Sequence, residues 1–417
     1  MTLTTVRLAA PPHTVVTVPG SKSVANRMLM CASLADGVSV LSGLPDGDDT
    51  AVLVNGLPSI GVGIDRVSAD TVRVTGRHRP SGGNLWCGLA GTSSRFATAL
   101  AALGSSDITI DGGEPLRRRP IGPLLDALRV LGAQIVSDDN RLPVTVCGPA
   151  TGSVVAVRGD ISSQFISALM MIGPLLPEGL RIEVTGTLVS RSYVEMTAAV
   201  MSIFGHTDID VSSTVVTIGA GRYLPVETLV EPDASSASYP MAIAALTGGT
   251  IEIPGLTDAS LQGDASLAEI LQSMGCDVER NRHGCTVTGP TSPLDPFDLD
   301  MSDISDLVPT MAVLATQASA ECRIRGVGFI RAKESDRLNV LATQLSALGA
   351  DISETDDGLV IRPSALHGGS VAVHDDHRMA MAFGVLGTVI DGITVDEPEV
   401  VTKSWPSFWG MIEGLRQ

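Results

Sequence analysis

The chain has 417 residues and a net charge of −18, and 44% of its residues are hydrophobic although only 3% are aromatic. The acidic balance argues against nucleic acid as a partner, because binding to a phosphate backbone requires a basic face. No apolar stretch reaches the about 18 uninterrupted residues of a transmembrane helix, and no secretory signal pattern opens the chain. We therefore expect a cytoplasmic protein without membrane contact, whose length predicts two aliphatic domains.

Five amphipathic stretches, taken in chain order, end in a hydrophobic residue followed by Gly, with spacings of 70 to 74 residues. The five glycines are Gly61, Gly132, Gly205, Gly275 and Gly349. A repeat of this length indicates an array of similar supersecondary units, each of which buries its apolar face against its neighbours. One apolar stripe followed by Gly predicts an outer helix that ends in a left-handed cap.

A second set of helical segments runs in phase with the first and is apolar nearly all round. These segments begin near Ser23, Thr92, Ser163, Ser235, Asp306 and Arg378. We expect them to be buried, with polar residues at their starts satisfying unpaired backbone N–H groups. Runs such as 154–159, 251–255 and 359–363 predict strands between the helices. The sequence therefore predicts an α/β protein of six βαβαβ-like repeats, three in each domain.

Many of the few basic residues gather at the starts of the apolar helices or in clusters beside Gly. They are Lys22, Arg27, Arg95, Arg117 to Arg119, Arg331, Lys333, Arg337, Arg378 and Lys403. A cation at a helix N-terminus opposes the helix dipole unless an anion lies between them. The pattern predicts a pocket in which helix N-termini and cations bind a multiply anionic ligand.

Other chemistries find less support in the chain. The run from His374 to His377 has no third ligand at a recognisable spacing, so we expect no metal, and a capping role is the commoner function of such a run. Gly20 to Ser23 lacks the spaced Gly of a nucleotide-binding loop. The six Cys include no C-x-x-C pair, which favours reduced thiols.

Ten segments in order resemble the 5-enolpyruvylshikimate-3-phosphate synthase family. They are VPGSKSVANRMLM (18–30), LAGTSSR (89–95), RRRPIGPLLDAL (117–128), GDISSQF (159–165), SRSYVEMT (190–197), DASSASYPMA (233–242), SDLVPTMAVLA (305–315), KESDRL (333–338), DDHRMAMAF (375–383) and TKSWPSFW (402–409). The resemblance implies the two-domain enolpyruvyl transferase fold, with three βαβαββ units in each domain and helix N-termini that converge on an interdomain cleft. It places crossovers near Pro19 and Glu231, so that residues 1–18 and 232–417 form one domain and residues 19–231 the other.

The resemblance also implies transfer of the enolpyruvyl group of phosphoenolpyruvate to the 5-hydroxyl of shikimate 3-phosphate, in the shikimate pathway, without cofactor or metal and by a monomer. The implied contacts to shikimate 3-phosphate are Lys22, Ser23, Arg27, Ser162, Ser163, Gln164, Ser190, Tyr193, Asp306 and Lys333. Those to phosphoenolpyruvate are Lys22, Gly91, Arg119, Gln164, Arg337, Arg378 and Lys403. Asp306 is the implied base and Glu334 the proton-transfer partner, with Lys22 sharing the acid role.

Alternatives remain at both carboxylates and for the reaction. Asp306 could cap a helix, and Glu334 could pair with Arg337 three residues on. The related UDP-N-acetylglucosamine enolpyruvyl transferases use the same donor, but they carry Lys-Asn where this chain has Lys22-Ser23, and a Cys in the loop equivalent to residues 112–122. A non-catalytic anion-binding repeat protein is the third interpretation.

Two positions depart from the family pattern. Leu89 and Phe329 stand where many members carry Asn, which puts individual polar contacts in doubt. Gly91 keeps the family's small residue beside the phosphoenolpyruvate site. We therefore expect sensitivity to glyphosate, the inhibitor of this family that competes with that substrate.

Overall fold

The computed structural model describes residues 2–5, 7–77 and 79–416. The chain folds into two compact units. Unit 1 contains the chain up to Pro19 and from Glu231 onward, and unit 2 runs from Gly20 to Val230. These boundaries differ by one residue from the expected ones.

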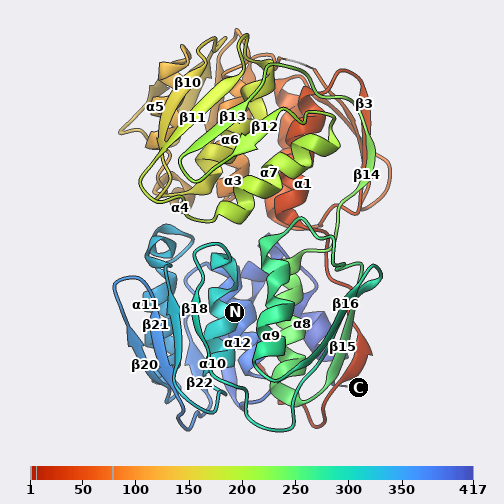
Figure 1. The fold of residues 1–417 in the computed structure, drawn as a ribbon, viewed down its shortest axis with the longest axis vertical. Helices are drawn as coiled ribbons and strands as arrows, with labels where there is room; N and C mark the ends of the chain where they lie inside the picture. The colour runs from red at the N-terminus through yellow and green to blue at the C-terminus, as the bar shows by residue number, and fades with distance from the viewer. Residues whose placement is uncertain (1, 6, 78, 417) are drawn as a thin grey trace. The chain divides into compact units, whose positions relative to one another are not determined.

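Three apolar helices pack against one another at the centre of unit 2 (Figure 1). They are α1 (Lys22–Leu34), α3 (Gly91–Ala101) and α6 (Ser163–Ile172). The remaining helices of the unit are α2 (Asp48–Gly56), α4 (Glu114–Arg117), α5 (Gly122–Val130), α7 (Arg191–Ile203) and the 3-10 turns η1 (Leu57–Ile60) and η2 (Gly173–Leu175). The central helices are buried over almost their whole length, as their continuous apolar sequences predict.

Unit 1 repeats this arrangement with a second central trio. The trio is α8 (Ala234–Thr247), α10 (Val308–Ala315) and α12 (His377–Leu386). The other helices are α9 (Leu267–Ser273), α11 (Arg337–Ala347), α13 (Phe408–Gly414) and the 3-10 turns η3 (Gly263–Ser266), η4 (Ser305–Leu307), η5 (Gly328–Ala332) and η6 (Pro398–Lys403). Ser238 on α8 and Thr310 on α10 share a hydrogen bond of 3.0 Å inside this trio.

Small mixed sheets surround both trios. Unit 2 has the strand orders β14-β3-β5-β4, β6-β7-β9-β8 and β10-β11-β13-β12, and unit 1 has β16-β17-β15-β2, β18-β19-β21-β20 and β1-β23-β22. The strands of unit 2 are β3 (Val38–Ser42), β4 (Gly63–Arg66), β5 (Val72–Thr75), β6 (Gly83–Trp86), β7 (Ile108–Asp111), β8 (Gln134–Ser137), β9 (Val144–Cys147), β10 (Val154–Arg158), β11 (Leu180–Thr185), β12 (Ile209–Val211), β13 (Val215–Ile218) and β14 (Glu227–Leu229). Those of unit 1 are β1 (Thr2–Thr4), β2 (His13–Val15), β15 (Thr250–Pro254), β16 (Asp277–Asn281), β17 (Gly284–Thr288), β18 (Asp298–Asp300), β19 (Cys322–Arg325), β20 (Asp351–Glu354), β21 (Leu359–Arg362), β22 (Gly369–Val371) and β23 (Ile393–Asp396).

The predicted α/β repeat is confirmed, with one difference in the sixth copy. Each four-stranded sheet has a parallel pair next to an antiparallel hairpin, with the register that βαβαββ units require. The segments beside the two crossovers complete sheets, because β14 pairs with β3 and β2 pairs with β15, both in parallel. In the described residues the sixth sheet has three strands, and β1 from the chain start takes the place of the final hairpin.

The glycines that end the outer helices adopt the predicted conformation. Gly61, Gly132, Gly205, Gly275 and Gly349 have φ between 81° and 99°, the left-handed region that other residues rarely enter. The starts of the central helices are more varied. Ser21, Ser162, Asp233 and Asp376 cap α1, α6, α8 and α12, whereas α3 and α10 begin without a side-chain cap.

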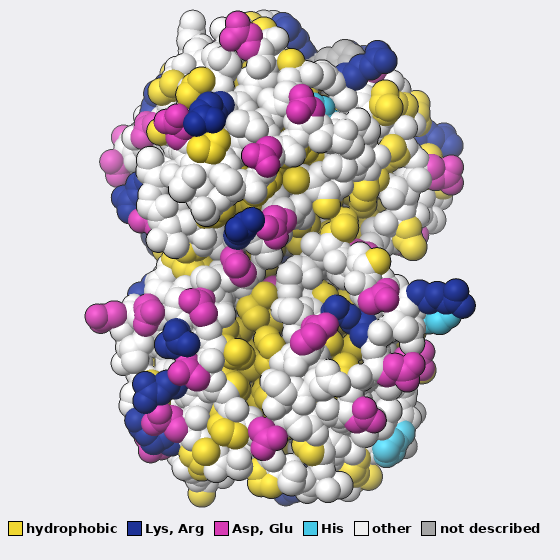
Figure 2. Space-filling view, viewed as in Figure 1, with side chains coloured by type: hydrophobic (Ala, Val, Ile, Leu, Met, Phe, Trp, Pro, Cys, Tyr) yellow, Lys and Arg dark blue, Asp and Glu magenta, His cyan; other side chains and the backbone are white. Residues whose placement is uncertain are grey.

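Charged side chains of both signs are interspersed on the face of each unit that Figure 2 shows, and no continuous basic surface is visible among the residues coloured there. None of the described helices is long and apolar enough to cross a membrane. All six cysteines are free.

Candidate active site

Lys22 and Ser23 are the first two residues of α1 in unit 2. The Lys22 ammonium lies 3.4 Å from the carboxylate of Asp49, which is in the first turn of α2. A lysine at a helix start is disfavoured by the helix dipole, and Asp49 offsets that cost. Asp49 is a site residue that the sequence analysis missed, because an acidic residue at a helix start is common for structural reasons alone.

Arg27 joins three helices beneath this position. It is 1% exposed, and it donates to the Thr197 hydroxyl at 2.7 Å, the Tyr193 carbonyl at 3.1 Å and the Ser167 hydroxyl at 3.2 Å. A further bond of 2.9 Å returns to the Ser23 carbonyl. Burial lowers the pKa of Arg27 to about 10. Arg27 therefore orders the helix starts, and its direct contact with a substrate stays a prediction.

Gly91 begins α3 and lies against Arg119, which follows α4. A Cβ atom at position 91 would be 2.6 Å from Nη1 of Arg119 and 2.8 Å from its Cζ. Only glycine therefore lets the guanidinium lie flat on the helix start. Four residues into the same helix, Arg95 donates to the carbonyl of Pro120, next to Arg119, at 3.1 Å.

Arg95 also connects α3 to the start of α6. Its guanidinium donates to Oε1 of Gln164, and its Cζ atom lies over the ring of Phe165, 5.2 Å from the ring centroid. Ser162 caps α6 by accepting from the backbone N–H of Gln164 at 3.3 Å, and Ser163 is the first residue of the helix. The structure thus brings Gly91, Arg119 and Gln164 into one connected group through Arg95.

Ser190 precedes α7 in a strained conformation. Its φ of 54° and ψ of 46° lie in the left-handed region, which is costly for a residue with a Cβ atom. Among the described residues its buried hydroxyl oxygen has no hydrogen-bond partner. Strain together with an unsatisfied polar atom is typical of a ligand-binding position. Tyr193 follows in the first turn of α7, with its ring 5.9 Å from the Arg27 guanidinium.

Arg337 is the centre of the candidate site in unit 1. It is 1% exposed at the start of α11, and it binds Asp376 at 2.8 Å, Glu334 at 2.9 Å and Asp306 at 3.1 Å. Burial alone would lower the pKa of Arg337, but the charges of these three carboxylates outweigh it and raise the pKa. The guanidinium is therefore a permanent cation that fixes three carboxylates around it.

The two candidate proton-transfer groups are held by further cations. The Asp306 carboxylate lies 2.6 Å from the Arg378 guanidinium and 4.0 Å from the Lys333 ammonium. The Glu334 carboxylate lies 3.0 Å from the Lys403 ammonium. Four cations and two carboxylates predicted from the sequence thus lie together in unit 1. Most of these residues come from the starts of α11 and α12, the turn η4 and the end of η6. These four segments therefore surround one site.

The structure shows the local contacts of these two carboxylates. Asp306 is not the N-cap residue of η4 or α10, and its oxygens bind Arg337 and Arg378. Glu334 does form the expected local pair with Arg337, and it binds Lys403, 69 residues further along the chain, as well. The local pairing was therefore correct for Glu334 but incomplete.

Asp376 is the second residue that the sequence analysis missed as part of the site. Its carboxylate is fully buried and accepts hydrogen bonds from the Ser335 hydroxyl and from the backbone N–H of Arg378, both at 3.0 Å. It also accepts from Nε of Arg337 and so fixes that guanidinium. The run from His374 to His377 thus contains a helix cap that also positions an arginine. Among the described residues no group of three or more His, Cys, Asp or Glu side chains is arranged so that it could hold a metal ion.

The two departures from the family pattern have visible surroundings. Leu89 is 40% exposed in the turn before α3. Phe329 lies in η5, and its ring centroid is 5.8 Å from Nζ of Lys333, a cation–π contact that steadies this lysine. Phe329 therefore contributes to the site through Lys333.

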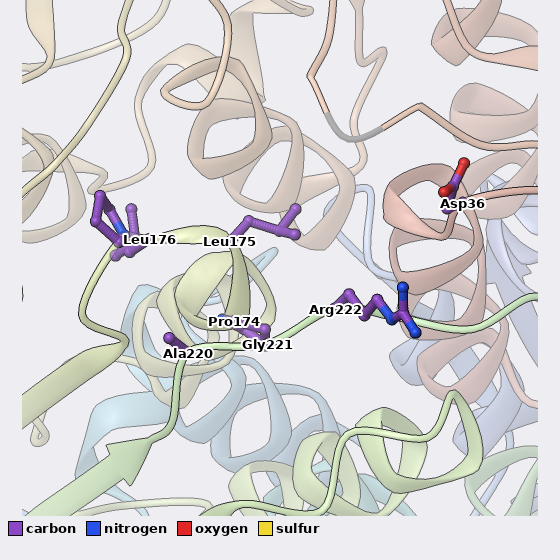
Figure 3. Close-up of a pocket in the computed structure, with 8 residues that line it drawn as sticks. Asp36, Pro174, Leu175, Leu176, Ala220, Gly221 and Arg222 are labelled. Atoms are coloured by element: carbon purple, nitrogen blue, oxygen red, sulfur yellow. The ribbon is translucent and has the colours of Figure 1, made fainter.

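Unit 2 also contains a hollow of about 370 Å³ (Figure 3). It is lined by Asp36, Pro174, Leu175, Leu176, Pro177, Ala220, Gly221 and Arg222. Asp36 follows the C-terminal end of α1, and residues 173–175 follow the C-terminal end of α6. The candidate site residues lie at the opposite, N-terminal ends of the same helices, so this hollow is not part of the site.

Comparison with known proteins places the chain in a family. The model of the EPSP synthase family (3-phosphoshikimate 1-carboxyvinyltransferase) matches residues 9–412. Proteins named 3-phosphoshikimate 1-carboxyvinyltransferase are 39% identical in Methanosphaerula palustris, with 98% of both chains covered, and 36% identical in Shewanella pealeana, with 96% of both covered.

Solved structures agree on the fold. EPSP synthase from Acinetobacter baumannii matches with a TM-score of 0.81 at 23% identity over 99% of this chain and 98% of that one. The enolpyruvyl transferase NikO from Streptomyces tendae matches with a TM-score of 0.78 at 18% identity over 99% and 97%. At these identities the structures establish the architecture, whereas the sequence relatives and the family model establish kinship. The chain belongs to the EPSP synthase family.

Proposed function

We propose that this protein transfers the enolpyruvyl group of phosphoenolpyruvate to the 5-hydroxyl of shikimate 3-phosphate, releasing phosphate. Family membership supports the reaction. The observation that carries the assignment of residues is the unit 1 network, in which Asp306 and Glu334 are held among Arg337, Arg378 and Lys403. Asp306 and Glu334 are groups that can accept and return a proton, which enolpyruvyl transfer requires and anion binding alone does not.

Both substrates are polyanions, and the proposed contacts come from both units. Phosphoenolpyruvate is bound by Lys22, Gly91, Arg119, Gln164, Arg337, Arg378 and Lys403. Shikimate 3-phosphate is bound by Lys22, Ser23, Arg27, Ser162, Ser163, Gln164, Ser190, Tyr193, Asp306 and Lys333. Planar guanidinium groups suit carboxylate and phosphate, since each can donate two parallel hydrogen bonds. The cations of the site also stabilise the charge that develops on the phosphate as it leaves.

Proton transfer accompanies both halves of the reaction. In the addition, the 5-hydroxyl oxygen attacks C2 of phosphoenolpyruvate, its proton passes to Asp306, and C3 receives a proton from Glu334 or Lys22 to give a tetrahedral intermediate. In the elimination, C3 loses a proton, the C2–C3 double bond re-forms and phosphate departs. A carboxylate surrounded by cations stays ionised and can accept a proton when the hydroxyl loses its own.

The same residues support inhibition by glyphosate in competition with phosphoenolpyruvate, because Gly91 leaves the Arg119 guanidinium in place. We also propose that the protein is a cytoplasmic monomer without nucleic acid or membrane partners. Its two domains would be residues 1–18 with 232–417 and residues 19–231. The acidic charge of −18 supports the lack of nucleic acid binding.

Phosphate release tests the proposal. Purified protein is given phosphoenolpyruvate with either shikimate 3-phosphate or UDP-N-acetylglucosamine, without added metal, beside an Asp306→Ala variant. We expect release with shikimate 3-phosphate alone, and its loss in the variant. Release with the sugar nucleotide would assign the chain to the related transferases. Binding of shikimate 3-phosphate without release would indicate an anion-binding protein.

A further inference from the structure

A further carboxyl group, Asp264, is buried in η3 and has no role in the mechanism above. Helix α8 packs against both η3 and η4, the turn that carries Asp306. The turn that carries Asp264 is fastened to the start of α8 by Gln262. Oε1 of Gln262 accepts from the backbone N–H of Ala234 at 2.9 Å, and its Nε2 donates to Glu231 at 2.8 Å. The position of Asp264 is therefore set by the same scaffold that begins a central helix.

The Asp264 carboxyl is poorly satisfied as an anion. The residue is 4% exposed, its Oδ2 accepts from the Ser235 hydroxyl, and its buried Oδ1 has no hydrogen-bond partner among the described residues. A buried carboxylate oxygen without a donor is costly, whereas a protonated carboxyl group needs fewer donors. The geometry therefore favours a proton on Asp264.

Burial and the nearby carboxylates also favour a proton on Asp264. Burial first, and then the negative charge of Asp306, raise the pKa of Asp264 to about 7, with a further increase from Asp233, whereas the Ser235 hydrogen bond and the charge of Arg378 lower it. On α9, Glu269 is exposed and pairs with Arg280 at 2.9 Å, and Arg280 also donates to the carbonyl of Ala265 at 2.6 Å.

We propose that Asp264 is a positioning residue whose charge state sets how firmly Asp306 holds a proton and how strongly Arg378 attracts the substrate anion. Two interacting carboxyl groups share their ionisation, so the charge on one makes a proton on the other more stable. Arg378, bound to Asp306 at 2.6 Å, lies within the same field. No proton moves between Asp264 and the substrate in this scheme, because Asp264 exchanges its proton with the solvent as the pH changes.

The consequence is a pH-dependent affinity for phosphoenolpyruvate. Below about pH 7 Asp264 is neutral and the cations act on the substrate undiminished. Above this pH, the negative charge on Asp264 weakens the attraction of the cations for phosphoenolpyruvate. We expect the KM for phosphoenolpyruvate to rise about fivefold as the pH passes through this range, given the strength of a charge interaction at partial screening.

Three variants test the inference, which rests on the proposed function. Asp264→Asn keeps the shape without the charge and should abolish the rise in KM. Ser235→Ala removes the hydrogen bond that favours the carboxylate and should move the rise to higher pH. Asp258→Asn, in an exposed turn of the same unit, should behave as the unaltered protein. An unchanged KM profile in both Asp264→Asn and Ser235→Ala would overturn the proposal.

Thermal unfolding without substrates gives a readout that does not depend on the reaction. The pKa of Asp264 in the folded protein, about 7, exceeds the unfolded value of about 3.9, so its stabilising contribution is complete below the unfolded pKa and is lost as the pH rises through 7. The unfolding temperature of Asp264→Asn, relative to that of the unaltered protein, should therefore increase between about pH 5 and pH 8.

These two measurements separate failure of the inference from failure of the proposed function. If the unfolding temperatures of Asp264→Asn and the unaltered protein differ in a pH-dependent way but no phosphate is released, the titration of Asp264 is supported and the proposed reaction is wrong. Phosphate release with a constant difference in unfolding temperature would overturn the inference alone. If Asp264→Asn does not fold, Ser235→Ala still tests it, because its KM profile must shift upward.

Discussion

The two units surround their candidate site residues with different chemical groups. In unit 1 the cations Arg337, Arg378 and Lys403 are bound to carboxylates. In unit 2 the donors of Arg27 and Arg95 are bound to hydroxyl, carbonyl and amide oxygens.

This difference separates two tasks. Carboxylates among cations can accept and return protons, but they reduce the net attraction for an anionic ligand. Neutral oxygens fix a guanidinium in place without cancelling its charge. We infer that the carboxylates of unit 1 carry most of the proton transfer and that the guanidinium groups of unit 2 orient anions. Substitution of Asp306 should then lower kcat, whereas substitution of Arg119 should raise the KM for phosphoenolpyruvate.

Asp306→Asn should have the largest effect on turnover. The amide keeps the size of the side chain but cannot accept a proton, so kcat should fall by about 10²- to 10⁴-fold, the usual contribution of a general base. Binding of shikimate 3-phosphate, measured by titration calorimetry, should change far less. Asp303→Asn, an exposed neighbour three residues earlier, is the matched control. A variant that retained a tenth of kcat would remove Asp306 from proton transfer.

Asp376→Asn should weaken the fold of unit 1 as well as turnover. Arg337 would lose its closest partner at a fully buried position, and breaking such a pair costs about 3–5 kcal/mol. Urea unfolding followed by tryptophan fluorescence reports this, since Trp405 is buried in the same unit. Glu321→Gln, which breaks surface pairs with Arg323 and Arg362, should cost far less, because exposed ion pairs are weak. Equal losses in both variants would show that the Arg337 network adds no stability.

Arg119→Ala should act on affinity in unit 2 while leaving the fold intact. Loss of hydrogen bonds to a charged ligand costs about 1.5–3 kcal/mol, so kcat/KM for phosphoenolpyruvate should fall about 10- to 150-fold. Arg118→Ala is the control, since Arg118 is adjacent and 64% exposed at its side chain. A variant that fails to fold would show that Arg119 serves the core instead.

Gly91→Ala should reproduce part of this effect without touching the arginine itself. The added methyl group would lie 2.6 Å from Nη1 of Arg119, and the flexible side chain must move away. We expect a rise of about tenfold in KM for phosphoenolpyruvate and a similar loss of glyphosate inhibition, from about 1.4 kcal/mol of lost interaction. At Gly122 a Cβ atom would meet only Asn140 at 3.5 Å, so Gly122→Ala should change neither quantity.

Much of the fold followed from periodicity alone. The glycine-ended stretches became outer helices, the apolar segments became two central trios, and the polar starts of those segments brought Asp306, Arg378 and Gln164 to the candidate sites. These features are local, so sequence spacing reports them directly. The replacement of the last hairpin by β1 was not predictable, because it pairs segments nearly 400 residues apart.

The site was predictable in its charges but not in its connections. Asp376 lay in a run interpreted as a helix cap, and Arg95 was one of the cations predicted to bind an anion; only the fold reveals that they position Arg337 and Gln164. Asp264 carried no signal at all, since its burial and its neighbour Asp306 depend on the packing of η3 and η4 against α8. Roles that act through another residue require the three-dimensional structure.

Ser190 should give the smallest effect and the cleanest separation of binding from stability. Its hydroxyl has no partner among the described residues, so Ser190→Ala should leave the free energy of unfolding within about 0.5 kcal/mol of the original. A substrate that uses this hydroxyl would lose one hydrogen bond of about 1 kcal/mol, raising the KM for shikimate 3-phosphate about fivefold.

Ser190→Gly distinguishes the hydroxyl from the backbone strain. Glycine removes the same hydrogen bond but accepts a φ of 54° without strain. The strain of a left-handed conformation costs other residues about 1–2 kcal/mol. The greater flexibility of glycine in the unfolded chain offsets about 0.5–1 kcal/mol of that gain. Both variants should therefore show the same KM, while Ser190→Gly should be slightly the more stable. Different KM values with equal stability would mean that the conformation of residue 190, and not its hydroxyl, matters for binding in unit 2.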